Sequence, residues 1–187
     1  MKSQLHLVLL LLVVLFPVLV VASPTPRPAN WAQPMLNSEL GNWAKLDDKV
    51  YRSAQPDEDD FKMLGKFGIK AVINLREYHS DKDEADGTRI TLYRFKLNAS
   101  EITYDDLIKV MKVIKQQKGP ILLHCWHGSD RTGAMAAAYR IVFQGWSKSA
   151  AIEELLKGGY GFHSIYHNIP ELLNSLDEEK FRRDVQM

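Results

Sequence analysis

The residues with the clearest chemical potential lie in one ten-residue segment, His124 to Gly133, which reads His-Cys-Trp-His-Gly-Ser-Asp-Arg-Thr-Gly. It contains the only cysteine of the chain, Cys125, and five residues separate that cysteine from Arg131. A thiolate is a strong nucleophile, and a guanidinium group presents a planar pair of donors that matches two phosphate oxygens. The spacing therefore predicts a loop that holds a phosphate group against a nucleophilic sulfur.

The segments on either side of this loop predict where it sits. Residues 120–123 are Pro-Ile-Leu-Leu, typical of a buried strand, and residues 132–143 are rich in alanine and other apolar residues, typical of a helix. The loop thus leads into a helix N-terminus, where unpaired amide groups and the helix dipole favour an anion. An isolated thiol titrates near pH 8.5, and we expect this position to lower the pKa of Cys125.

The other residues of the loop are predicted to hold the phosphate or to support the loop. Thr132 follows the arginine, and its hydroxyl either stabilises the thiolate or caps the helix. His124 is expected to support the loop through a hydrogen bond. The predicted substrate-binding residues are Trp126, His127, Gly128, Ser129, Thr132 and Gly133.

Residues 124–132 fill every fixed position of the pattern H-C-x-x-G-x-x-R-[ST]. In this the chain resembles the cysteine-dependent protein tyrosine and dual-specificity phosphatases, and a weaker similarity at residues 50–56, 139–146 and 158–162 is to their exported bacterial branch. The resemblance implies a single-domain protein tyrosine phosphatase-like α/β fold. It also implies catalysis by Cys125 and Arg131 through a phosphocysteine intermediate, with no metal or other cofactor.

Cleavage of a phosphate ester also calls for an acid that protonates the leaving group. The resemblance implies an aspartate on a loop well before the cysteine, but residues 95–101 contain none. Asp130 is the first candidate, because the loop there resembles that of the myotubularin-like phosphatases, which carry an aspartate just before the arginine; the alternative is that it braces the loop. Glu101 near the expected position is the second, and catalysis without an acid is a further option. The remaining candidates lie in an acidic loop and are Asp81, Asp83 and Asp86.

Zinc bound by Cys125 and nearby histidines is the other chemistry that these residue types offer. Structural zinc sites are four-coordinate and usually use ligand pairs at short spacing, and the chain has no second cysteine. We therefore expect no metal site. A rhodanese-like sulfurtransferase is a more remote alternative, because the loop of that family usually lacks the pair Thr132-Gly133.

The beginning of the chain differs in composition from the rest. Lys2 precedes an unbroken apolar run at residues 7–16, and residues 20–22 are small enough for a signal peptidase. The apolar stretch is shorter than the roughly 20 residues of a spanning helix, which argues against an uncleaved anchor. The predicted organisation is a signal peptide at residues 1–22, a flexible N-terminal segment at 23–43 and a dual-specificity phosphatase-like domain at 44–187.

Export predicts a periplasmic or secreted protein. Exported chains usually carry paired cysteines in disulfides, whereas this one has a single cysteine, which indicates a thiol kept for chemistry. The formal net charge of +1 over 187 residues offers no basic surface for nucleic acid. The expected partner is a phosphorylated protein or a small phosphate substrate, without nucleic acid and without stable membrane insertion after signal cleavage.

Strand and helix patterns alternate along the predicted mature chain, which is typical of a central sheet flanked by helices. Thr103 and Asp106 have the spacing of a capping box. Strands are predicted at residues 50–52, 70–75, 90–95 and 121–124, and helices at 57–66, 103–117, 132–143, 147–157 and 169–181.

The favoured function is the hydrolysis of phosphate monoesters, first phosphotyrosine and then phosphoserine or phosphothreonine, through a phosphocysteine intermediate. One alternative is an inositol phosphate or phosphoinositide phosphatase, which Asp130 makes worth testing. The other is a weakly active phosphate-binding module that keeps Cys125 and Arg131 without an effective acid.

Overall fold

The computed structural model describes residues 26–36 and 38–187. The predicted signal peptide at residues 1–22 lies outside the described residues, as does the start of the predicted N-terminal segment. Among the described residues, no helix has both the length and the apolar character needed to cross a membrane.

Six strands of the described chain form one sheet in the order β1-β2-β3-β6-β4-β5. The four strands from β3 to β5 are parallel to one another, and β1 and β2 join the edge as antiparallel strands. The central strand β6 therefore ends beside the ends of β3 and β4, at the edge where open α/β sheets bind ligands. The strands are β1 (Gln33–Pro34), β2 (Ala44–Lys45), β3 (Val50–Ser53), β4 (Ala71–Arg76), β5 (Thr91–Leu97) and β6 (Ile121–His124).

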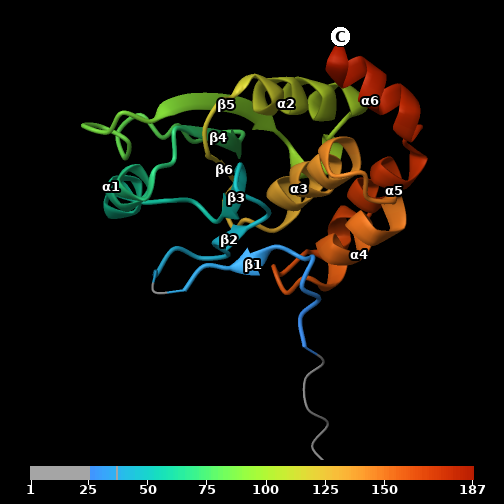
Figure 1. Ribbon diagram of the computed structural model, residues 1–187, viewed down its shortest axis with the longest axis horizontal. Coiled ribbons are helices and arrows are strands. Elements are labelled where there is room, and N and C mark those ends of the chain that lie inside the picture. Colours follow the sequence, from blue (N-terminus) through green and yellow to red (C-terminus); the bar gives the residue numbers. More distant parts are fainter. Residues whose placement is uncertain (1–25, 37) are drawn as a thin grey trace, which may run out of the picture.

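Helices cover both faces of the sheet (Figure 1). Helix α1 packs on one face, and the other helices gather on the opposite face, with α3 against the sheet. This arrangement confirms the predicted α/β fold with a central sheet flanked by helices. The helices are α1 (Glu58–Phe67), α2 (Tyr104–Gln116), α3 (Asp130–Phe143), α4 (Lys148–Lys157), α5 (Asn168–Ser175) and α6 (Glu178–Gln186), with short 3-10 turns η1 (Ala99–Glu101) and η2 (Ser164–Tyr166).

Alternation along the central strand explains why both faces are covered. Ile121 and Leu123 of β6 are fully buried in the cluster formed with α2 and α3, whereas Leu122 is fully buried in the cluster formed with α1. Successive side chains of a strand point to opposite faces, so an apolar run needs a layer of helices on each. The strand before the cysteine is thereby held from both sides.

Helix α2 begins at the capping box predicted from the sequence. The Thr103 side chain accepts a hydrogen bond from the backbone N–H of Asp106, and the Asp106 carboxylate accepts one from the backbone N–H of Thr103. Helix α1 begins in the same way at Asp57 and Asp60. These reciprocal bonds satisfy amides that a helix start otherwise leaves unpaired.

The prediction of a single helix at residues 169–181 was wrong, because the chain forms two helices there. Helix α5 ends before Leu176, whose ψ of 133° is extended. Asp177 then caps α6 by accepting a hydrogen bond from the N–H of Lys180. Apolar spacing continues through this break, and only the cap at Asp177 signals it.

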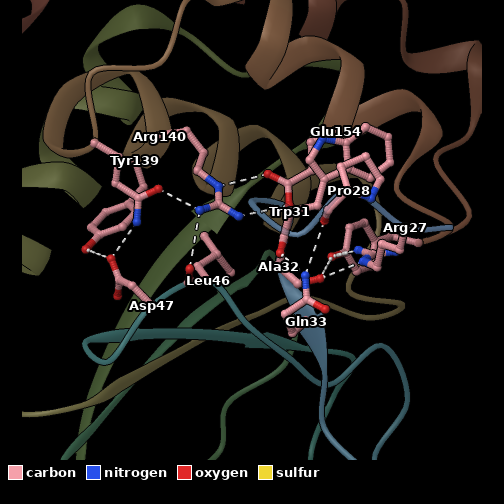
Figure 2. Close-up of polar contacts among 12 residues, drawn as sticks. Arg27, Pro28, Trp31, Ala32, Gln33, Leu46, Asp47, Tyr139, Arg140 and Glu154 are labelled. Atoms are coloured by element: carbon pink, nitrogen blue, oxygen red, sulfur yellow. Dashed lines mark hydrogen bonds and ion pairs between the residues drawn. The ribbon is translucent and has the colours of Figure 1, made fainter.

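Part of the segment predicted to be flexible, residues 23–43, is packed on the domain. The guanidinium of Arg27 donates to the carbonyl of Gly158 at 2.7 Å and also contacts the Tyr160 hydroxyl. The backbone N–H of Ala32, a residue only 1% exposed, donates to Glu154 (Figure 2). Polar contacts thus hold a proline-rich stretch that has no apolar periodicity, which is why the sequence pattern did not reveal its docking.

Glu154 also forms a buried ion pair with Arg140. Its two carboxylate oxygens accept from Nε and Nη2 of Arg140 at 2.8 and 3.0 Å, and the two side chains are 5% and 2% exposed (Figure 2). A buried charge that loses its partner is strongly destabilising. The pair therefore joins α3, α4 and the N-terminal segment.

We expect Glu154→Gln to lower the free energy of unfolding by about 3 kcal/mol, because it leaves the Arg140 guanidinium buried without a counter-charge. Urea denaturation measures this change. The matched control is Glu153→Gln on the same helix, where the pair with Lys157 is more than half exposed on both sides and the expected cost is under about 1 kcal/mol. Equal losses in the two variants would contradict this account of Glu154.

Candidate active site

The predicted loop connects β6 to α3 at the carboxyl edge of the sheet. Cys125 directly follows β6, and α3, a helix of 14 residues, begins at Asp130. Cys125 is 2% exposed, and Trp126 and Arg131 of the same segment line two surface hollows. The loop therefore has the predicted position between a buried strand and a helix N-terminus, where amide groups favour an anion.

Gly128 allows the loop to turn against the neighbouring strand. Its φ is +73°, and a Cβ atom added to it would lie 2.5 Å from the carbonyl oxygen of Ser53 at the end of β3. Glycine alone meets both requirements, because it adopts positive φ readily and has no side chain to collide. The loop backbone is thus packed directly on β3.

A buried arginine lies under the loop. Arg52 of β3 is 1% exposed, donates from Nη2 to the carbonyl of Gly128 at 2.5 Å, and lies 3.5 Å from the centre of the Tyr160 ring. Burial lowers the pKa of Arg52, while Tyr160, Glu154 and Cys125 raise it. A positive charge buried under the loop favours the binding of an anion such as a phosphate group.

Residues 158–163 brace the loop from the other side. The carbonyl oxygen of Tyr160 accepts from Oγ of Ser129 at 2.5 Å and from Nδ2 of Asn42 at 3.0 Å. Asn42 also donates to the carbonyl of His127 at 2.7 Å. Ser129, which was predicted to bind substrate, is 2% exposed and directs its hydroxyl to this brace.

His124, predicted to support the loop, is fully buried and bonded to an acidic side chain. Its Nε2 lies 2.9 Å from Oδ2 of Asp81, and Oδ1 of Asp81 accepts from Gln55 and Asn74 at 3.0 and 2.9 Å. Burial raises the pKa of Asp81, but the hydrogen bonds from His124, Gln55 and Asn74 together hold it below its ordinary value. The structure thus places one of the candidate acids, Asp81, behind the cysteine as a partner of His124.

Asp81 also belongs to a group of possible metal ligands. The ligand atoms of His79, Asp81 and Glu84 lie within 4.8 Å of one another, the one such group in residues 26–36 and 38–187. Both oxygens of Asp81 already accept hydrogen bonds, and Nε2 of His79 lies 2.8 Å from Glu84. The hydrogen bonds to Asp81 and the contact between His79 and Glu84 account for the closeness of these three side chains.

Arg131 keeps donors available for an anion. Nη1 donates to the carbonyl of Leu97 at 3.2 Å, and Nε is buried without a hydrogen-bond partner in the described part of the chain. No carboxylate among the described residues forms an ion pair with Arg131 or with Arg76. An unpaired guanidinium next to the loop is suited to bind phosphate oxygens.

Arg131 lines two adjacent hollows of about 280 and 310 Å³, which also share Trp126 and Tyr166. Arg76 lines the first hollow, with its guanidinium 4.1 Å from the centre of the Trp126 ring and Nη1 2.9 Å from Oε1 of Gln55. Burial and the charge of Arg131 lower the pKa of Arg76. Arg76 and Arg131 therefore face one small hollow that Glu77 also lines, and the excess of positive charge favours an anionic ligand.

The other candidate acids lie in different surroundings. Asp130 lines the second hollow and accepts two hydrogen bonds from His163, from its backbone N–H and from Nδ1, both at 2.9 Å. Glu101 is exposed and lines neither hollow. Asp83 and Asp86 are also exposed. A catalytic role for Asp130 stays a prediction.

Two predicted substrate-binding residues lie within α3. A Cβ atom on Gly133 would lie 2.4 Å from the Leu155 side chain, so this glycine allows α3 and α4 to pack closely. The Thr132 hydroxyl is buried without a hydrogen-bond partner in the described residues, and its proposed contact with the thiolate stays a prediction.

Sequence reasoning did not assign roles to several residues that surround the loop. Arg52 and Tyr160 lie in segments that contributed to the family resemblance and His163 directly follows one of them, but nothing in their spacing relates them to Cys125. Arg76 is the last residue of β4 and lies one residue beyond the strand predicted at 70–75. Only the order of the strands brings these side chains together.

Comparison with known proteins supports the same interpretation. A model of the tyrosine phosphatase family matches residues 39–166. The chain is 34% identical over 140 residues to the dual specificity protein phosphatase TpbA of Pseudomonas aeruginosa, an alignment that covers 73% of this chain. It spans 62% of the length of that relative.

Two further similarities concern a solved structure and a plant protein. A crystal structure of P. aeruginosa TpbA, a cysteine-to-serine variant in complex with phosphotyrosine, superimposes with a TM-score of 0.77 at 27% identity and covers 86% of this chain and 99% of that chain. An inositol diphosphatase of Arabidopsis thaliana is 27% identical over 125 residues, covering 62% of this chain and 61% of the plant protein.

We expect Asp81→Asn to lower the free energy of unfolding at pH 7 by about 1–3 kcal/mol, because His124, Gln55 and Asn74 lose a buried charged acceptor. The stability that the Asp81 charge contributes is present above the unfolded pKa of about 3.9 and is lost as the pH falls through the lower folded pKa. The difference between wild type and variant should therefore shrink in strong acid. Urea denaturation across that range measures it, and a difference that grows with acid would contradict the assignment.

Proposed function

Because the chain belongs to the tyrosine phosphatase family, we propose that it hydrolyses phosphate monoesters, principally phosphotyrosine and also phosphoserine and phosphothreonine. One observation supports this most strongly. Cys125 lies between a buried strand and a helix N-terminus, six residues before Arg131, whose guanidinium has no ion-pair partner in the described residues. A phosphoryl group is the ligand that these donors and this nucleophile fit best.

The reaction proceeds in two steps without a metal ion. The Cys125 thiolate attacks phosphorus, the sulfur–phosphorus bond forms as the ester bond breaks, and the leaving oxygen takes a proton. Water then attacks the phosphocysteine, which returns the thiolate and releases inorganic phosphate. Arg131 and the loop amides bind the equatorial oxygens, whose charge increases in the transition state.

A second candidate substrate is an inositol phosphate with several phosphate groups. Arg76 and Arg131 share the smaller hollow, and each has a guanidinium without an ion-pair partner in the described residues. A second phosphate on the same substrate would bind the second arginine. The similarity to the Arabidopsis inositol diphosphatase supports this candidate.

We expect the purified protein to release phosphate from phosphotyrosine peptides, Cys125→Ser to lose at least about 10⁴-fold in kcat/KM, and Arg131→Lys to lose about 10²–10³-fold. A serine hydroxyl is a far weaker nucleophile than a thiolate, and lysine cannot contact two oxygens in a planar pair. Rapid quenching with ³²P-labelled substrate should detect phosphocysteine in the wild type only.

Unchanged turnover in Cys125→Ser would exclude this mechanism. Binding of phosphate without turnover would identify a phosphate-binding module instead. A higher kcat/KM on an inositol polyphosphate than on every phosphotyrosine peptide tested would favour the second candidate substrate.

We also propose that residues 1–22 are a cleaved signal peptide and that the protein acts in the periplasm or outside the cell. The apolar run at residues 7–16 and the small residues before Ser23 support this proposal. Expression of the full chain in a Gram-negative host should yield a periplasmic protein whose N-terminal sequence starts near Ser23. An intact N-terminus found in the cytoplasm would overturn it, and Leu12→Arg, which interrupts the apolar run, should block export.

A further inference from the structure

Cleavage of the ester bond leaves negative charge on the leaving oxygen, and a proton donor that shares a hollow with Arg131 is placed to neutralise it. Asn98 lines the first hollow in the region where the family resemblance implied an acid, and its amide is not an acid. The carboxylates that line the two hollows are Glu77 and Asp130. Neither oxygen of Asp130 is free, because each accepts a hydrogen bond from His163 at 2.9 Å.

His163 is the more accessible member of this pair. Its side chain is 50% exposed, against 10% for Asp130, and its ring lines the same hollow as Arg131. Nδ1 is bonded to Asp130, whereas Nε2 has no hydrogen-bond partner among the described residues. A carboxylate bonded to one ring nitrogen fixes the orientation of an imidazole, which leaves the other nitrogen to exchange protons.

We propose that His163, oriented by Asp130, is the residue that carries the proton in phosphate ester cleavage at Cys125. This inference rests on the proposed phosphatase function and identifies the proton donor that the sequence left open. Asp130 is then a positioning residue. Its hydrogen bond from the backbone N–H of His163 holds the start of the 163–166 turn against the beginning of α3.

Protons and electrons balance through both steps. As the sulfur of Cys125 bonds to phosphorus, the electron pair of the breaking ester bond moves to the leaving oxygen, which takes the proton from Nε2 of His163. In the second step Nε2 takes a proton from water, the water oxygen bonds to phosphorus, and the sulfur–phosphorus bond breaks to restore the thiolate. His163 is again protonated at the end of the cycle.

Other titratable or charged groups face the same hollow and act on His163. They are Asp130, His127 with its ring centre 5.6 Å from that of His163, Tyr166 at 6.3 Å, and Arg131. His127 is therefore the comparison residue, because it is a second imidazole on the same hollow without the bond to Asp130. His167 lines neither hollow and bonds to the carbonyl of Ile165, so it provides a neutral control.

The test compares kcat/KM for p-nitrophenyl phosphate and phenyl phosphate in full-length protein carrying His163→Gln. Phenolate is the poorer leaving group and depends more on a proton donor. We expect a loss of about 10²-fold or more on phenyl phosphate and under about 5-fold on p-nitrophenyl phosphate. The fall of wild-type kcat/KM for phenyl phosphate with rising pH, as the imidazolium is lost, should disappear in the variant.

His167→Gln should match the wild type on both substrates, and circular dichroism melting shows whether each variant is folded. Asp130→Asn should keep a weaker leaving-group effect and a shifted pH profile, because the ring loses its charged partner but remains. The proposal would be overturned if His163→Gln lost equally on the two substrates. It would also be overturned if the larger loss on phenyl phosphate appeared instead in only one other variant, namely His127→Gln, Glu77→Gln or Asp130→Asn. These outcomes differ from failure of the phosphatase function itself, in which wild type and Cys125→Ser would be equally inactive on both substrates.

Discussion

The candidate active site is built over a buried positive charge that forms no ion pair with any residue the structure describes. Arg52 is almost wholly enclosed, and its recorded partners are the carbonyl of Gly128 and the ring of Tyr160. Burying an unpaired cation costs free energy, and an anion bound above it recovers part of that cost. A loop built over such a charge is more stable when it holds a phosphate group, so the contact that packs the loop on β3 also favours substrate binding.

Two aspartate–histidine pairs flank the loop, and their exposure separates their roles. Asp81 and His124 have almost no exposed surface, and two amide side chains donate further hydrogen bonds to Asp81. Asp130 and His163 lie at the mouth, where half of the imidazole surface is open. The buried pair of Asp81 and His124 stabilises the fold, whereas the pair of Asp130 and His163 is open to water and can exchange protons.

Much of the fold could be predicted from residue patterns. The apolar run of β6, the capping box at Thr103 and the alanine-rich α3 are local signals, because a strand, a cap and a helix face each depend on residues close in sequence. The break at Leu176 was missed because both helices bury residues on a continuous apolar stripe. The docking of Arg27 and Ala32 was missed because polar bonds to α4 and Tyr160 hold that segment, and such bonds leave no periodic pattern.

By itself the sequence determined the chemistry at the centre of the site, since a cysteine, a turning glycine and an arginine at short spacing must lie on one loop. The tertiary structure decided everything that reaches this loop from elsewhere. Arg52 and Arg76 lie near the ends of β3 and β4, the parallel strands on either side of β6, and His163 lies on the turn after α4. Residues from separate elements meet only through strand order and helix packing, and contacts of long sequence separation have no signature in one chain's local pattern.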